Sequence, residues 1–301
     1  MPSVSLPAFA KINLDLRILG TRPDGYHDLR TIFQSLALFD QVTVTRRRGP
    51  FEIICDQEDI PTNRRNLVWQ AASLLHRVST GKTSALQGIS IDLRKRIPSE
   101  AGLGGGSADA AMTLLALNQL WKLDLDLATL TRIGARLGAD VPYFLVGGTS
   151  LGLGRGDDIY PLADLPTVHV VILRPGFGVS TADAYQWFDE ETRRTREPAP
   201  RQCPAGWPRW VATLRNDLEA PVVRHHPAIA RIRQSLLDAG ANFAAMSGSG
   251  SAVFGLFERA EAARRAANDL ARPGWLSLHT RTMARREYAR RVAAGLKTRI
   301  R

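Results

Sequence analysis

One stretch between residues 88 and 121 limits most strongly the folds that this chain can adopt. Residues 88–93, Gly-Ile-Ser-Ile-Asp-Leu, alternate apolar and polar side chains, which is typical of a half-buried strand. Residues 107–121 are rich in alanine and leucine and open with Ser107, a residue type that often caps helices, so we expect a helix. Between the two runs stand four glycines within five positions, Gly102, Gly104, Gly105 and Gly106.

A glycine loop that leads into a helix indicates an anion site. The first turn of a helix presents unpaired N–H groups and the positive end of the helix dipole, and both attract phosphate. Neither of two widespread phosphate motifs fits. No Gly-Lys-Ser/Thr follows the loop, and Ser107 stands where the dinucleotide-binding pattern needs a third glycine. An ordinary strand-to-helix turn without a ligand stays open on these residues alone.

Length and composition describe a globular protein of two domains. The chain has 301 residues, of which 44% are hydrophobic and 23% are charged, as in soluble proteins with a sizeable core. The two cysteines, Cys55 and Cys203, are far apart and form no metal-type pair, so we expect reduced thiols. Residues 1–7 contain no basic residue, and no run approaches the about eighteen apolar residues of a membrane span. We therefore expect a cytoplasmic protein.

The chain carries a net charge of +11, which suits nucleic acid, a membrane surface or an anionic substrate. The excess arginine is scattered, and its one dense run is the tail from Arg281 to Arg301. This tail lacks the aromatic residues that a base-stacking surface needs. We interpret it as mainly a solvated helix face.

The first strand that we expect, residues 8–19, places two kinds of side chain on its two faces. Ile12 and Leu14 share one face, whereas Lys11 and Asn13 share the other. For an isolated strand, a solvated polar face is the default interpretation. A Pro-Asp-Gly turn then leads to Tyr26 and His27, which either pack in the ordinary way or form a platform for a flat ring.

Asp140 is the most ambiguous residue of the first half. It stands between the end of a predicted helix, residues 126–137, and a Val-Pro pair. The carboxylate is either a solvated turn residue or the partner of a cation, because a charged acid in apolar surroundings needs one. The other elements expected before residue 160 are strands over 29–45, 51–55 and 147–157, and a helix over 67–75 capped by Asn66.

We place a domain boundary near residue 160, which gives domains 1–160 and 161–301. The second half reads as strands over 168–173, 242–246, 252–257 and 276–282 with helices over 181–188, 227–239 and 258–271. This order fits two helices on one face of an antiparallel sheet, roughly ferredoxin-like. Four prolines indicate an exposed loop over 194–209, and the Ser-Gly-Ser-Gly-Ser run after Met246 suits a hairpin turn.

Taken together, these segments resemble the GHMP kinase family of small-molecule kinases. The resemblance covers nearly the whole chain and rests on four motifs: Pro7-Ala-Phe-Ala-Lys-Ile-Asn-Leu14, Arg22-Pro-Asp-Gly-Tyr-His27, Gly102-Leu-Gly-Gly-Gly-Ser107 and Gly138-Ala-Asp-Val-Pro142. It implies an α+β fold of two domains. The N-terminal domain would be α/β and similar to ribosomal protein S5, and the C-terminal domain would be ferredoxin-like.

The resemblance also implies a reaction: the γ-phosphoryl group of ATP moves to the 2-hydroxyl of a methylerythritol linked to cytidine diphosphate, in isoprenoid precursor biosynthesis. Asp140 would take the proton of that hydroxyl or hold it in line, while Lys11 would keep Asp140 ionised and screen the phosphoryl group. Mg²⁺ would accompany ATP, with no ligands assigned. The partners would be small molecules, without nucleic acid or membrane, and the chain would be a monomer or a homodimer.

The matching positions imply three groups of binding residues. ATP would contact Asn66, Lys95 and the loop of Pro98, Ser99, Glu100, Ala101, Gly102, Leu103, Gly104, Gly105, Gly106, Ser107 and Ala108. The acceptor would contact Asn13, Tyr26, His27, Thr181 and Tyr185, and the phosphate loop would be supported by Ser247, Gly248, Ser249 and Gly250. Two residues depart from the family pattern. Glu100 brings a negative charge near the triphosphate, and Ala108 replaces a serine.

Two other functions stay open. Another kinase of this family, of the homoserine or mevalonate type, would share the phosphate loop without needing Tyr26, His27 and Tyr185. A basic nucleic-acid-binding protein is suggested by the charge, and it would bind RNA or DNA in a salt-dependent way.

Overall fold

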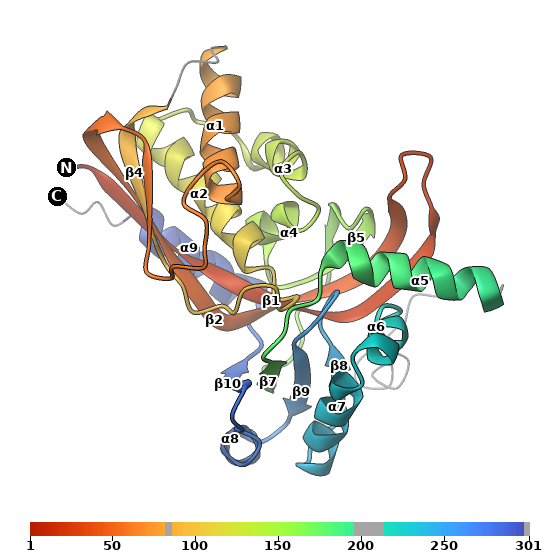
Figure 1. The fold of residues 1–301 in the computed structure, drawn as a ribbon. Helices are drawn as coiled ribbons and strands as arrows, with labels where there is room; N and C mark the ends of the chain where they lie inside the picture. Colours follow the sequence, from red (N-terminus) through yellow and green to blue (C-terminus); the bar gives the residue numbers. More distant parts are fainter. Residues whose placement is uncertain (82–85, 196–213, 298–301) are drawn as a thin grey trace.

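The computed structural model describes residues 1–81, 86–195 and 214–297. Most of the expected loop over 194–209, with Cys203, lies outside these residues. The first sheet has the order β3-β4-β2-β5-β6, and β1 pairs with β2 (Figure 1). Its strands are β1 (Ser3–Thr21), β2 (His27–Pro50), β3 (Glu52–Cys55), β4 (Gln87–Arg94), β5 (Thr149–Gly154) and β6 (Asp158–Pro161).

The β1–β2 hairpin is the longest feature of this sheet. The two strands pair antiparallel from Ser3 opposite Thr45 to Thr21 opposite His27, with three register shifts along the way. Such irregularities bend a strand and increase its twist. The hairpin therefore curves out of the first domain, and its tip lies near α5 (Thr181–Thr195) in Figure 1.

Four helices cover the first sheet: α1 (Leu67–Thr80), α2 (Gly105–Trp121), α3 (Leu127–Ala135) and α4 (Val141–Val146). Helix α2 is central, because it packs on α1, α4, β1 and β2. The predicted cap of α1 is confirmed: the Asn66 side chain accepts a hydrogen bond from the Val68 N–H. Helix α4 was not expected from the sequence, since its six residues are too few to show a helical period.

The second sheet has the order β10-β7-β9-β8, with β7 (His169–Pro175), β8 (Phe243–Met246), β9 (Val253–Phe257) and β10 (Trp275–Arg281). All three pairings are antiparallel. Helices α7 (Ala228–Asp238) and α8 (Ala260–Asp269) share one core with Val171 and Leu173 of β7, so both cover the same face. The ferredoxin-like prediction is confirmed. The short helix α6 (Glu219–His225) was not expected.

A third core joins the two domains. The other face of β7, with Val170 and Ile172, packs against Ile12 and Leu14 of β1. On the opposite face of β1, Lys11 lies against Gly104 of the glycine loop and is only 3% exposed, so the strand is buried on both faces. The default expectation of a solvated polar face on this strand is wrong, because the strand is not isolated but lies between two domains.

The last helix, α9 (Arg285–Lys297), returns to the first domain and packs against β1. Tyr288 and Val292 are buried there, and the Arg291 guanidinium lies 4.7 Å from the centre of the Phe9 ring. The expected solvated face is therefore wrong for one side of this helix. Tyr288 and Val292 stand four positions apart within a run of arginines, so they share one helix face, and that face is buried. The boundary near residue 160 stays a prediction. Helix α9 lies after that boundary in the sequence but packs against β1 of the first domain.

One predicted strand of the first domain is shorter than expected. Residues 147–157 contain β5 and then a turn that leads into β6. Gly154 and Gly156 both have positive φ, at 65° and 92°, which places a turn where a continuous strand was expected. Within the described part of the chain, no helix is both long and apolar enough to cross a membrane.

Candidate active site

A cleft of about 1400 Å³ lies between the two domains. Nearly all the predicted site residues line it, from Lys11 on β1 to Gly250 in the second domain. Two predicted residues do not. Ala108 and Ser247 are fully buried behind the cleft wall, and Ser247 acts on the cleft through the loop backbone.

The glycine loop ends in helix α2 two residues earlier than expected. Gly104 is the N-cap residue with φ of 74°, and the helix begins at Gly105, so Ser107 is the third helical residue and not the cap. Only glycine fits this cap position, because a side chain on Gly104 would lie 2.5 Å from the Phe144 ring. The first turn of α2 therefore consists of small residues whose backbone N–H groups are accessible from the cleft, as an anion site requires.

Hydrogen bonds from both domains hold the loop carbonyls. Leu103 O accepts from the Lys11 N–H at 3.0 Å, and Ala101 O accepts from the Ala252 N–H at 3.2 Å. Ser247 Oγ donates to Gly102 O at 2.9 Å. The contact at Gly102 leaves no space for a side chain, since a Cβ there would lie 1.9 Å from Ser247 O. The loop path is thus fixed by its surroundings.

The serine-glycine turn at residues 247–250 is itself held by Asn216. This buried side chain donates through Nδ2 to Met246 O at 2.9 Å and to Gly248 O at 2.6 Å. Sequence reasoning did not find Asn216, because it belongs to no motif or periodic pattern.

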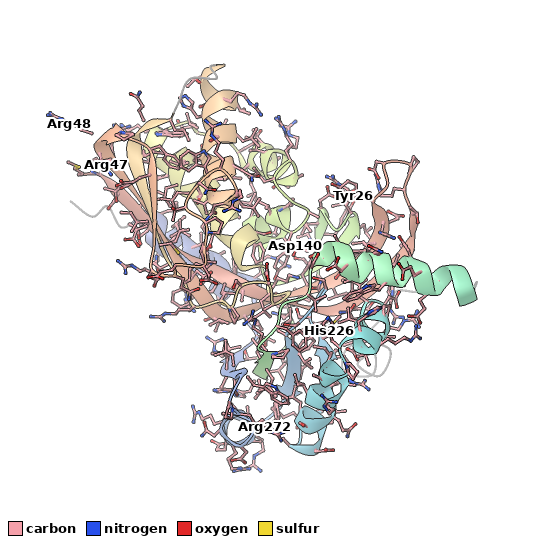
Figure 2. The ribbon with its side chains drawn as sticks, viewed as in Figure 1. Tyr26, Arg47, Arg48, Asp140, His226 and Arg272 are labelled. Atoms are coloured by element: carbon pink, nitrogen blue, oxygen red, sulfur yellow. The ribbon has the colours of Figure 1, made fainter. Side chains whose placement is uncertain are left out.

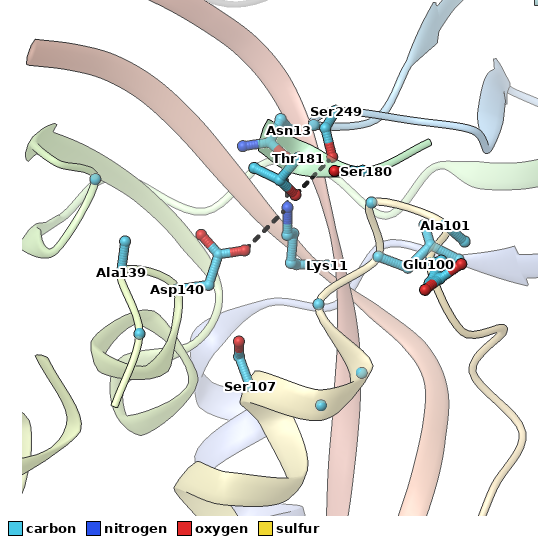
Figure 3. Close-up of a pocket in the computed structure, with 18 of the residues that line it drawn as sticks. Lys11, Asn13, Glu100, Ala101, Ser107, Ala139, Asp140, Ser180, Thr181 and Ser249 are labelled. Atoms are coloured by element: carbon cyan, nitrogen blue, oxygen red, sulfur yellow. Dashed lines mark hydrogen bonds and ion pairs between the residues drawn. The ribbon is translucent and has the colours of Figure 1, made fainter. Parts of the chain in front are cut away.

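Lys11 and Asp140 meet at the head of the loop (Figure 3). Lys11 Nζ lies 3.3 Å from Asp140 Oδ2 and donates to Asn13 Oδ1 at 2.6 Å. The Lys11 side chain is 4% exposed, whereas that of Asp140 is 33% exposed. Asp140 occupies the N-cap position of α4 but makes no capping bond. Of the two interpretations from sequence, the paired carboxylate is confirmed.

Lys95 lies deeper, between two carboxylates. Its Nζ donates to Asp40 Oδ2 and to Asp109 Oδ2, each at 2.5 Å, and its side chain is 5% exposed. Burial raises the pKa of Asp109 to about 7, against the opposing pull of Lys95. Burial alone would lower the pKa of Lys95, but Asp109 and Asp40 outweigh it and raise that pKa. Because Lys95 Nζ already donates to both carboxylates, a contact with ATP would have to share this atom with Asp40 and Asp109.

Two other predicted nucleotide residues have specific local roles. The Asn66 side chain caps α1 and also donates through Nδ2 to Pro61 O at 2.7 Å, so both of its polar groups are already bonded. Glu100 has φ of 50° and turns toward Gly178, on the other side of the loop from Lys11 in Figure 3. The expected repulsion of a triphosphate is reduced by that orientation.

Aromatic side chains from both domains meet at the other end of the cleft. His27 stacks on Tyr185 of α5 with ring centroids 4.8 Å apart, so no ring fits between these two. Tyr26 is 59% exposed on the hairpin tip, and the Arg155 guanidinium lies 5.3 Å from its ring centre. Figure 2 shows Tyr26 near α5, with Asp140 close to the start of that helix. Thr181 Oγ1 lies 3.1 Å from Ser249 Oγ, which joins α5 to the serine-glycine turn.

Two family models match this sequence. Residues 66–148 match the N-terminal domain of GHMP kinases, and residues 207–274 match their C-terminal domain. A relative from Moorella thermoacetica is 43% identical over 293 residues, which cover 94% of this chain and 100% of the relative. The chain belongs to the GHMP kinase family. It is therefore a kinase that uses ATP, and the predicted two-domain α+β fold is confirmed.

The relatives agree on one name. The Moorella protein is 4-diphosphocytidyl-2-C-methyl-D-erythritol kinase, and so is a relative from Geobacter sulfurreducens, 40% identical over 94% of this chain and all of its own length. A crystal structure of 4-(cytidine 5'-diphospho)-2C-methyl-D-erythritol kinase matches with 35% identity and a TM-score of 0.74, covering 92% of this chain and 98% of that one. Homoserine kinase from Cytophaga hutchinsonii, at 20% identity and a TM-score of 0.60, shares the fold.

Within this kinase fold, three acidic residues of the cleft, Asp109, Asp189 and Glu190, were missed by sequence reasoning. Asp109 lies in the first turns of α2 and Asp189 lies on α5, and both line the cleft. A signal for Asp189 was present, because Thr181, Tyr185 and Asp189 recur every four residues and so share one helix face. Asp109 has no comparable signal, since its burial depends on Lys95, fourteen residues earlier.

Proposed function

We infer that this GHMP kinase transfers the γ-phosphoryl group of ATP to the 2-hydroxyl of 4-diphosphocytidyl-2-C-methyl-D-erythritol, in isoprenoid precursor biosynthesis. One observation carries the proposal: a single cleft joins the Lys11–Asp140 pair to an aromatic end, in a chain that matches kinases of this name over their full length. Phosphoryl transfer needs the first feature, and recognition of a cytosine ring needs the second.

The end of the cleft at the glycine loop, here called the phosphate end, would position the triphosphate and balance its charge. The backbone of residues 98–108 would wrap the triphosphate, with the start of α2 directed at it. Lys11, buried and paired, would stabilise the negative charge that spreads over the transferring group. Asp140 is exposed enough to reach an acceptor hydroxyl, and Lys11 Nζ lies 3.3 Å from its Oδ2. It would take the proton or hold the hydroxyl in line, and a loose transfer accepts either role.

The acceptor would lie between these groups and the aromatic end. The Asn13 side chain, held by Lys11 and by Thr31 Oγ1 at 2.8 Å, would orient the methylerythritol part. Tyr26 is exposed and would cover one face of a cytosine ring. Tyr185 would form the opposite wall, and His27, which stacks on Tyr185, would read the edge of the base. Thr181 would contact the same substrate from α5.

Mg²⁺ fits this arrangement as a companion of ATP. Among the described residues, no three His, Cys, Asp or Glu side chains gather into a metal cluster. Mg²⁺ at nucleotide sites commonly keeps several waters and uses substrate phosphates with one or two protein oxygens. Figure 3 shows the Ser107 hydroxyl at the start of α2 and the Asp140 carboxylate facing Lys11, and these two groups would supply those contacts. Bound there, the ion would neutralise phosphate charge.

Several further properties belong to the same proposal. The partners would be ATP and the cytidylated substrate, both anionic, and the net charge of +11 favours their approach. The protein would work in the cytoplasm, where ATP is supplied, without nucleic acid or membrane, as a monomer or a homodimer.

The decisive assay measures ADP release with three acceptors: the cytidylated methylerythritol, homoserine and mevalonate. We expect turnover with the first alone. No turnover of the cytidylated acceptor would refute the proposed substrate, and turnover of homoserine or mevalonate in its place would assign the chain to another branch of the family. Salt-sensitive RNA binding without ADP release would favour the nucleic-acid alternative.

A further inference from the structure

Asp189 has no role in the chemistry described above, yet it holds one of the substrate residues. We propose that Asp189 fixes the tautomer of His27 and thereby makes the acceptor site select cytosine over uracil. This inference rests on the proposed function, because it requires that His27 faces the base of the acceptor. Asp189 would be a positioning residue, acting through His27 and not on the substrate itself.

The geometry ties the two residues together across the domain boundary. Asp189 Oδ1 lies 2.7 Å from His27 Nε2, and the two side chains are 35% and 10% exposed. The same imidazole stacks on Tyr185, one helical turn before Asp189 on α5. Stacking fixes the plane of the ring, and the hydrogen bond fixes its rotation in that plane. Both residues line the cleft.

An ionised carboxylate can only accept hydrogen bonds, so His27 must donate from Nε2. A neutral imidazole carries one N–H, which leaves Nδ1 with a lone pair. In the part of the chain that the structure describes, Nδ1 of His27 has no hydrogen-bond partner. The pair therefore offers an acceptor atom at the aromatic end of the cleft, in the way that outer carboxylates fix the tautomer of metal-binding histidines.

Cytosine and uracil differ at the edge that such an acceptor would read. Cytosine carries an amino group, a donor, where uracil carries a carbonyl oxygen, an acceptor. An Nδ1 lone pair would bond the cytosine amine but would face the uracil oxygen without a proton between them. A site built around one hydrogen bond rejects an analogue that cannot make it, because a polar atom is then left unpaired.

The test compares the wild type with Asp189→Asn and Asp189→Ala, on cytidine- and uridine-linked forms of the acceptor. The asparagine amide can donate to Nε2, which permits the tautomer with a proton on Nδ1. We expect the wild type to prefer the cytidine form by about 100-fold or more in kcat/KM. In Asp189→Asn the preference should fall by at least about tenfold. Asp189→Ala should give an intermediate ratio, because the His27 ring in that variant is free to exchange tautomers.

Asp183→Asn is the matched control, since it makes the same charge change on α5 outside the cleft and should leave the ratio unchanged. A melting curve for each variant checks its folding. ¹⁵N NMR of the imidazole reads the tautomer without any substrate, and we expect a protonated Nε2 and a bare Nδ1 in the wild type.

A proton on Nδ1 in the wild type, or an unchanged ratio in Asp189→Asn, would overturn the role of Asp189. If the wild type turns over neither acceptor, the proposed function fails and base selection fails with it. The NMR result then still decides whether Asp189 fixes the tautomer of His27, so the two failures are distinguishable.

Discussion

The two ends of the cleft are built from different parts of the chain. At the phosphate end, main-chain carbonyls of Ala101, Gly102 and Leu103 are held by hydrogen bonds from both domains. At the aromatic end, the proposed recognition depends on side chains, and Tyr26 is 59% exposed. Backbone geometry is common to any sequence that folds this way, whereas side chains can be exchanged one by one. Under the proposed function, this difference would let kinases of one fold act on different acceptors.

The largest effect should come from Asp140, where the two ends meet. Asp140→Asn keeps the shape but removes the charge that pairs with Lys11 at 3.3 Å. We expect kcat to fall by about 10³-fold or more, with ATP affinity nearly unchanged. Steady-state kinetics and ATP titration calorimetry measure the two quantities. Asp269→Asn, an exposed residue at the end of α8, is the control. A variant that keeps most of its rate would exclude Asp140 as the catalytic group.

Gly102→Ala tests whether the phosphate end depends on the path of its main chain. Its φ of 72° and the Ser247 carbonyl 1.9 Å from the new Cβ force the loop to move. Such a displacement should lower kcat/KM for ATP by about 100-fold. Gly81→Ala has a similar φ of 68° but nothing within 4 Å, so it should cost only about 1 kcal/mol of stability and leave the kinetics intact. Equal kinetics in the two variants would show that the loop tolerates displacement.

Ser247→Ala tests whether the second domain supports the loop. It removes the donor to Gly102 O at 2.9 Å and leaves that carbonyl unsatisfied. We expect a loss of about 1 kcal/mol in the free energy of unfolding and a rise of about threefold in the KM for ATP. Ser277→Ala loses a comparable bond to Ala267 O, at 2.7 Å, outside the cleft. A KM shift in that control as large as in Ser247→Ala would contradict a local role.

The last expected effect concerns the pH dependence of stability. The pKa of Asp109, about 7 in the folded chain against an ordinary 3.8, means that the folded state binds more protons between about pH 4 and 7. Its contribution to stability must therefore decrease as pH rises through that window. An asparagine amide does not titrate, so the stability of the Asp109→Asn variant relative to wild type should increase from about pH 4 to 7 and level off above it. Urea unfolding at several pH values measures this, and a constant difference would contradict the raised pKa.

The sequence predicted the elements whose patterns are local. The alternation over 88–93 became β4, the cap at Asn66 is observed, and the ferredoxin-like order of the second half is confirmed. The main features of the site were also recognisable, because a glycine loop and a lysine on an alternating strand are each visible within a few residues.

What could not be predicted depends on contacts between distant segments. The polar face of β1 is buried because the glycine loop and Asp140 lie against Lys11, and no property of residues 8–19 indicates that. Helix α9 packs on β1 of the first domain although it follows the whole second domain in the sequence. Lys95 becomes a buried ion-pair residue only when Asp40, fifty-five residues earlier, approaches it.

The most direct test asks whether the aromatic end selects the acceptor. It compares kcat/KM for the cytidylated acceptor with kcat/KM for methylerythritol phosphate, which lacks the nucleotide. ADP release is measured at saturating ATP. If the aromatic end selects the acceptor, removing the base and its stacking should lower kcat/KM by at least about 100-fold. Equal kcat/KM for the two acceptors would contradict the account, because selection would then lie at the phosphate end that the family shares.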